Sequence, residues 1–253
     1  MLLQSQSKRV ALLDELRGLF ILLMVFYHGC YNLAEIFRLD LPFFYSKPMQ
    51  FLQLVIAGDF IFISGCVSRY SRSNLKRGLQ IFSCGMVLTI VTAFVIPSQI
   101  ILFGVLHLLG FSMVFFALTR KWLDRIHPTF GMFLCMLLFL STYFISSGWI
   151  GFSPFAAPLP AQWYSVKFLF WLGIPGPGFF SSDYFSIFPW LFFFLAGTFC
   201  GVFFKENKLP DWVYRPHVPW LSRVGRHTLI IYLLHQPVLY GSMMLISYVG
   251  GFS

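Results

Sequence analysis

Long apolar runs, each close to the length of a membrane-spanning helix, restrict the fold of this 253-residue chain more than any other feature. Runs such as LFILLMVF and PWLFFFLAG are apolar throughout, whereas a β-barrel strand alternates apolar and polar residues. Only 11% of the residues are charged, compared with roughly a quarter in a soluble domain. The sequence therefore predicts an all-α integral membrane protein.

The positions of the apolar runs predict a bundle of about seven transmembrane helices. One further apolar segment, residues 163–172, is too short to cross a hydrocarbon core of about 30 Å at 1.5 Å per residue. We expect it to be re-entrant or to lie at the membrane interface. No fixed-period repeat is evident, so residues 1–253 are interpreted as a single domain. The predicted spans cover about residues 16–36, 50–67, 79–96, 100–118, 130–147, 187–204 and 228–248.

Basic residues cluster between the predicted spans, and Lys8 and Arg9 precede the first one. Cytoplasmic loops of membrane proteins carry an excess of Lys and Arg. With a cytoplasmic N-terminus, seven spans place all three clusters inside and the C-terminus outside. Without a soluble basic domain, the net charge of +9 does not indicate nucleic-acid binding. The clusters are Arg69, Arg72, Lys76 and Arg77; Arg120, Lys121 and Arg125; and Lys205, Lys208, Arg215, Arg223 and Arg226.

Small residues within the spans are interpreted as packing residues. The five cysteines are scattered singly, without the spacing of a metal site, so no metal cofactor is predicted. Gly197 and Gly201 form a GxxxG motif on the sixth span, which is typical of close helix contact in membranes. The cysteines are Cys30, Cys66, Cys84, Cys135 and Cys200.

The first span carries polar residues on one face. Arg17 and His28 are eleven residues apart, which is close to three helical turns and about 16 Å along the axis. Asn32 and Glu35 follow His28 by four and seven residues and share that face, and Asp14 lies one turn before Arg17. Ionisable residues inside a bilayer are costly and often functional, so this face is the first candidate site.

Asp59 is the second intramembrane outlier. Counted from the outer ends of the antiparallel first and second spans, Asp59 and His28 lie at about the same depth. A carboxylate at that level could accept a hydrogen bond from the imidazole and fix its tautomer. We therefore predict that Asp59 orients His28.

Three further polar residues, His107, His235 and Asp183, have two interpretations each. The two histidines lie at intermediate depth in their spans, and each could bind substrate or make a helix-to-helix hydrogen bond. Asp183, at the outer mouth of the sixth span, could bind a polar acceptor or cap the start of that helix.

Several motifs resemble the transmembrane acyltransferase superfamily. RVALLDELRGLFILLMVFYH is similar to its start, and the Arg17–His28 spacing resembles the Arg and His pair of acyltransferase-3 families. AGDFIFISGCVSRYS and FGVLHLLG resemble segments of the heparan-α-glucosaminide N-acetyltransferase catalytic domain, although His107 stands where the eukaryotic motif has Gln. SSDYFSIFPWLFFFLAG and VGRHTLIIYLLHQPVL resemble its bacterial branch.

The resemblance implies an enzyme of the bacterial cytoplasmic membrane that moves an acetyl group from cytoplasmic acetyl-CoA to a sugar amine or hydroxyl outside. His28 would be the catalytic base, by direct transfer or through an acyl-histidine, with Asp59 behind it. Asn32, His107, Asp183 and His235 would bind the acceptor. Two other functions stay open: an inactive binding protein of the same fold, and a proton-coupled or small-solute transporter that uses the same residues. A homodimer is also possible. The cations expected to hold the coenzyme A phosphates are Arg17, Arg69, Lys76 and Arg77.

Overall fold

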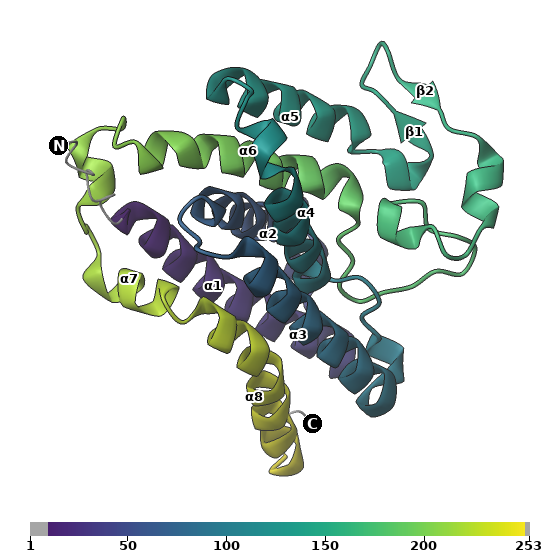
Figure 1. Cartoon of the computed structure of the whole chain (residues 1–253). Helices are drawn as coiled ribbons and strands as arrows, with labels where there is room; N and C mark the ends of the chain where they lie inside the picture. Colours follow the sequence, from purple (N-terminus) through teal and green to yellow (C-terminus); the bar gives the residue numbers. More distant parts are fainter. Residues whose placement is uncertain (1–9, 251–253) are drawn as a thin grey trace. The chain divides into compact units, whose positions relative to one another are not determined.

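The computed structural model describes residues 10–250, so the predicted flanking cations Lys8 and Arg9 lie outside the described range. The described chain is mostly helical (Figure 1). Within it, 6 helices are long and apolar enough to cross a membrane, which confirms a multi-pass all-α membrane protein. They are Ala11–Ile36, Lys47–Ser68, Asn74–Val95, Pro128–Ser147, Ile187–Lys205 and Thr228–Tyr248.

The fourth predicted span corresponds to α4, Val105–Leu123, which is not one of these 6 candidates. The helix begins later than predicted, because residues before it form the short 3-10 helix η3, Pro97–Gln99, and a non-helical stretch. Its last turn carries Arg120 and Lys121, which shortens the apolar length further. The count of seven spans therefore stays a prediction.

The segment 163–172 forms no continuous helix. It contains parts of two short 3-10 helices, η5 at Ala161–Ser165 and η6 at Phe170–Leu172. Before it, η4 at Ile145–Ser147 leads into a small antiparallel hairpin of β1, Trp149–Ile150, and β2, Ala157–Pro158. As predicted, this stretch is too short and irregular to cross a bilayer by itself. Whether it is re-entrant or interfacial stays a prediction at this point.

The described chain divides into two compact units. The first contains residues 10–60 and 209–250, and the second contains residues 61–208. Helix α2, Lys47–Ser68, passes from one unit into the other. The interpretation of the whole chain as one functional domain stays a prediction.

The first unit is built on α1, Ala11–Tyr31, which continues as a π-helix, η1, over Asn32–Ile36. Helix α1 contacts α7 so closely that a Cβ atom added to Gly225 would lie 1.8 Å from the Asp14 carbonyl oxygen. The buried Glu15 carboxylate accepts hydrogen bonds from the backbone N–H groups of residues 217 and 218 at 2.7 and 2.8 Å. The remaining elements are η2, Pro42–Tyr45; η7, Asp211–Tyr214; α7, Pro219–Gly225; and α8, Thr228–Tyr248.

The second unit contains two pairs of neighbouring helices, α3 with α4 and α5 with α6 (Figure 1). Here α3 covers Asn74–Val95, α5 covers Pro128–Thr142 and α6 covers Ile187–Lys205. The end of α2 also contacts α6, where a Cβ atom added to Gly197 would lie 2.2 Å from the Phe62 carbonyl oxygen. The GxxxG motif is therefore confirmed as a close-packing motif.

Candidate functional site

His28, on α1, has a defined tautomer. Its Nδ1 atom lies 3.0 Å from the carbonyl oxygen of Met24, one turn earlier on the same helix. Because a carbonyl oxygen can only accept a hydrogen bond, Nδ1 carries the proton and Nε2 carries the lone pair. The imidazole is therefore held with its basic nitrogen, Nε2, available for chemistry.

His235, on α8, is oriented in the same way and contacts His28. The two ring centroids are 4.8 Å apart in an edge-to-face arrangement. Nδ1 of His235 donates to the Tyr232 carbonyl oxygen at 2.6 Å, so Nε2 again carries the lone pair. Among the described residues of α8, His235 is the one that is buried, and its Nε2 atom has no hydrogen-bond partner there. The two imidazoles thus lie together, and in its neutral form each would carry its lone pair on Nε2.

An amide pair lies next to the histidines, with Asn32 one turn after His28 and Gln236 directly after His235. Asn32, which is fully buried at the start of the π-helix η1, donates from Nδ2 to Oε1 of Gln236 at 3.0 Å. The Asn32 Oδ1 atom is buried and has no partner among the described residues. π-helical turns frequently occur at functional sites. An unpaired buried acceptor costs about 1–3 kcal/mol, which is typical of a site that a ligand completes.

The predicted hydrogen bond between Asp59 and His28 is absent from the described structure, and Met24 takes the orienting role instead. Helix α2 begins at Lys47 rather than near residue 50, so Asp59 lies deeper than the sequence suggested. Leu52 and Tyr27 pack against the same buried clusters, and Asp59 follows Leu52 by seven residues, about 10 Å further along the helix. Asp59 Oδ2 is buried and has no hydrogen-bond partner in the described part of the chain.

Arg17 is the charged group that acts electrostatically on Asp59. Its Nη1 atom also lies 3.9 Å from Oδ1 of Asp14, one turn earlier, as the spacing predicted. The first unit therefore contains two distinct polar regions. One joins Arg17 with the two carboxylates, and the other joins the histidines with the amide pair.

His107, on α4, has partners for both ring nitrogens. The N–H of Gly104 donates to Nδ1 at 3.2 Å, so Nε2 carries the proton and faces the Thr89 hydroxyl at 3.3 Å. Thr89 passes the hydrogen bond on to the Ile101 carbonyl oxygen at 2.6 Å. This satisfied, buried network favours the helix-contact interpretation of His107 over substrate binding.

Asp183 caps a helix, although not the helix that the sequence suggested. Its Oδ2 atom accepts a hydrogen bond at 3.0 Å from the backbone N–H of Val105, the first residue of α4. A carboxylate is favourable at a helix N-terminus, where backbone N–H groups lack helical partners. The capping interpretation is therefore favoured, with α4 in place of α6.

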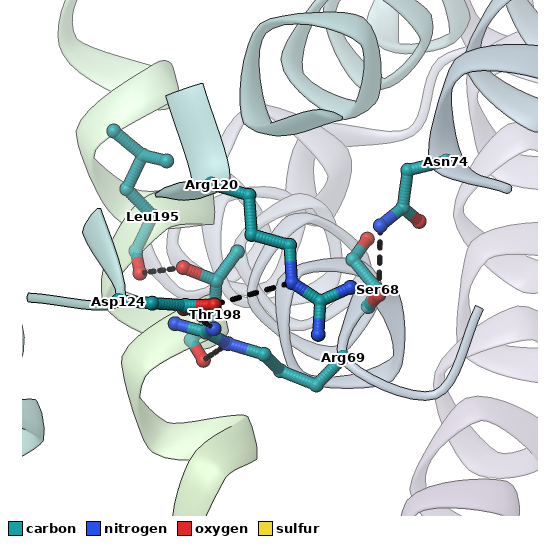
Figure 2. Close-up of polar contacts among 7 residues, drawn as sticks. All are labelled: Ser68, Arg69, Asn74, Arg120, Asp124, Leu195 and Thr198. Atoms are coloured by element: carbon teal, nitrogen blue, oxygen red, sulfur yellow. Dashed lines mark hydrogen bonds and ion pairs between the residues drawn. The ribbon is translucent and has the colours of Figure 1, made fainter. Parts of the chain in front are cut away.

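Arg69 lies within the second unit, inside a network of polar contacts (Figure 2). Its Nε atom donates to the Thr198 carbonyl oxygen at 2.7 Å, and Nη1 forms an ion pair with Asp124. The guanidinium also lies over the rings of Phe116 and Phe199, at 5.0 and 5.9 Å from their centroids. Arg69 was expected to bind coenzyme A, but its side chain is 4% exposed. Its Nε and Nη1 groups contact other residues of the protein instead of a ligand.

Replacing Arg69 with alanine is therefore expected to lower stability and leave acetyl-CoA binding unchanged. The variant removes a buried hydrogen bond from a charged donor to the Thr198 carbonyl oxygen, which contributes about 1.5–3 kcal/mol. The partly exposed partner Asp124 adds little, since solvent screens exposed ion pairs. Thermal unfolding in detergent and an acetyl-CoA binding titration measure the two effects, with the exposed Arg72→Ala as the control. Weaker acetyl-CoA binding at unchanged stability would return Arg69 to the cofactor site.

Lys76 and Arg77, by contrast, are exposed in the first turn of α3. Ser73 caps that turn by accepting the Lys76 N–H at 3.3 Å. Of the second-unit cations expected to bind coenzyme A, these two keep side chains that an anionic ligand could reach.

Comparison with known protein families identifies the family of this chain. The family model described as "Heparan-alpha-glucosaminide N-acetyltransferase, catalytic" matches residues 9–237. The chain belongs to this family. No curated protein and no solved structure matches it. Membership of the heparan-α-glucosaminide N-acetyltransferase catalytic family, together with the 6 apolar helices, makes the protein a multi-pass membrane transferase of the acetyltransferase type.

Sequence reasoning missed two parts of the site in this family member. The Met24 carbonyl could not be identified from the sequence, because every residue type has a backbone carbonyl. Gln236 could have been found, since it lies between His235 and Pro237 inside an apolar helix. A proline has no N–H to donate to the preceding turn, and polar residues inside membrane helices are often functional.

Proposed function

We propose that the protein transfers an acetyl group from cytoplasmic acetyl-CoA to an amine or hydroxyl of a sugar on the outer side of the membrane. The observation that carries the proposal is the contact between His28 and His235, each with its Nδ1 proton held by a backbone carbonyl. Family membership supplies the acetyltransferase class. The donor, the acceptor and the residue roles are the proposed parts.

His28 Nε2 takes the proton from the attacking amine or hydroxyl in this scheme. The nucleophile forms a bond to the thioester carbonyl carbon, and the carbon–sulfur bond breaks to release coenzyme A as a thiolate. The thiolate then takes the proton from His28, which returns to its neutral state. A positioned base of this kind contributes typically 10²–10⁴-fold to a rate. The Met24 carbonyl keeps the ring oriented throughout.

The acceptor would be bound by the unpartnered groups beside His28. Asn32 Oδ1 and His235 Nε2 are both hydrogen-bond acceptors, and both are buried without a partner in the described chain. A ligand that satisfies them must donate hydrogen bonds. Sugar hydroxyls and amines do so, which supports a sugar acceptor over an apolar one.

The donor would meet the cations on the predicted cytoplasmic side. Lys76 and Arg77 are proposed to contact the phosphates of coenzyme A, because they are exposed and Arg69 is not. Arg17 is retained as a proposed contact for the acyl-CoA, although Asp14 and Asp59 compete for its charge. Asp59 is proposed to compensate the positive charge of Arg17 instead of orienting His28.

Release of the coenzyme A thiol tests the function directly. Purified protein in lipid vesicles is supplied with acetyl-CoA and a panel of amino sugars and neutral glycans. We expect thiol release that depends on the acceptor, together with a mass increase of one acetyl group on that acceptor. Acceptor-independent or absent release, combined with protein-dependent solute uptake into the vesicles, would support the transporter instead.

A further inference from the structure

The segment between α5 and α6 has very little charge for a loop of its length. Residues 149–182 contain a single charged side chain, Lys167. A stretch that faces water in a soluble domain carries about a quarter charged residues. This segment nevertheless connects two candidate spans, so its ends are fixed at a membrane surface.

Hydrogen bonds from polar groups on the inner side of this segment hold it in place. The Tyr164 hydroxyl donates to the Ile145 carbonyl oxygen, and the Tyr184 hydroxyl donates to the Phe170 carbonyl oxygen. Burial raises the pKa of Tyr184 to about 12. Backbone bonds add to this order, with Gly151 donating to the carbonyl oxygen of residue 141 at 2.6 Å. Both tyrosine hydroxyls therefore point inward and hydrogen-bond to backbone carbonyl oxygens of the protein.

Large apolar side chains point outward from the same segment. Phe155 is 79% exposed and Phe168 is 69% exposed. This arrangement, with hydroxyls inside and apolar rings outside, is the reverse of a water-facing loop. We refer to the exposed large apolar side chains of this segment together as the aromatic platform: Trp149, Ile150, Phe152, Phe155, Trp163, Phe168, Trp171 and Phe180.

We propose that the aromatic platform is a lipid-binding surface that inserts into the headgroup and upper acyl region of the bilayer, at the ends of α5 and α6. Aromatic residues are enriched at this depth in membrane proteins. Lys167, exposed next to Phe168, could reach lipid phosphates while the rings lie deeper. A glycan-binding surface combines its rings with many polar side chains, whereas in residues 149–182 the exposed polar side chains (Ser153, Gln162, Ser165 and Lys167) are fewer than the exposed apolar ones. The proposal is independent of the acetyl-transfer reaction.

Quenching of tryptophan fluorescence by brominated lipids tests the platform. The full-length protein is reconstituted in nanodiscs of phosphatidylcholine with or without bromines on the upper acyl chain. Difference emission between the protein and each of Trp149→Phe, Trp163→Phe and Trp171→Phe isolates the signal of one side chain. We expect the bromolipid to remove most of each signal, while aqueous iodide removes little.

Trp190→Phe is the matched control, because Trp190 lies in the same unit but is buried in the protein. Its difference emission should resist both quenchers. Stronger quenching of the platform tryptophans by iodide than by bromolipid would overturn the proposal in favour of a water-facing or glycan-binding surface. Resistance to both quenchers would also overturn it, since protein would then cover the platform.

Discussion

Replacing His28 with alanine is expected to lower acetyl transfer by about two to four orders of magnitude, while acetyl-CoA binding changes little. The variant removes the Nε2 lone pair that takes the proton of the nucleophile, and this is the usual magnitude for a general base. Binding should persist, because the cations proposed to hold coenzyme A are not altered. Acceptor-dependent thiol release gives the rate, and an acetyl-CoA titration gives the dissociation constant.

Variants of two other histidines make this experiment specific. His127→Ala changes an exposed loop histidine and should retain full activity. His235→Ala removes the second Nε2 atom from the contact at 4.8 Å and should weaken acceptor binding, seen as a raised KM for the acceptor. Full transfer by His28→Ala would exclude it as the base. Loss of the catalytic rate in His235→Ala alone would assign the base to His235.

The site could be predicted from sequence only where one helix determines the geometry. Arg17, His28 and Asn32 lie on one continuous helical segment, so their spacing along the chain could be predicted, although Arg17 belongs to a different polar region from the other two. The predicted partner of His28, Asp59, lies on a second helix, so that prediction depended on the relative depth of the two helices. An error of about three residues in the start of α2 displaces a side chain by about 5 Å. That displacement is enough to take Asp59 out of hydrogen-bond reach of His28, whose acceptor, the Met24 carbonyl oxygen, lies on its own helix.

The fold shows the same division between local and long-range information. Apolar runs identified 6 membrane helices, because a bilayer imposes length and composition on each span separately. Arg69 and Lys76 belong to the same basic cluster between predicted spans, so the distribution of basic residues could not distinguish them. Arg69 is buried and hydrogen-bonded within the protein, whereas Lys76 is exposed. That distinction depends on Thr198 and Asp124, which follow Arg69 by 129 and 55 positions.

Gly197→Ala is expected to lower the free energy of unfolding by about 1–3 kcal/mol, as inserting a methyl group into a close contact does. The new Cβ atom would lie 2.2 Å from the Phe62 carbonyl oxygen, so α6 and the end of α2 would have to separate. The sequence motif indicated Gly197 and Gly201, but it gave no sign of Gly65. A Cβ atom on Gly65 would lie 2.1 Å from the Phe194 carbonyl oxygen in the same contact.

Denaturant or thermal unfolding in detergent measures the loss. Gly241→Ala is the control, because this glycine lies on α8 with no atom within 4 Å of the added methyl group. We expect that control to gain up to about 1 kcal/mol, because alanine favours the helix over glycine. Gly65→Ala should destabilise similarly, and the double variant should lose less than the sum, since one separation of the helices relieves both clashes. Wild-type stability in Gly197→Ala would mean that α2 and α6 do not pack at this distance, and strict additivity would mean that the two glycines act at separate contacts.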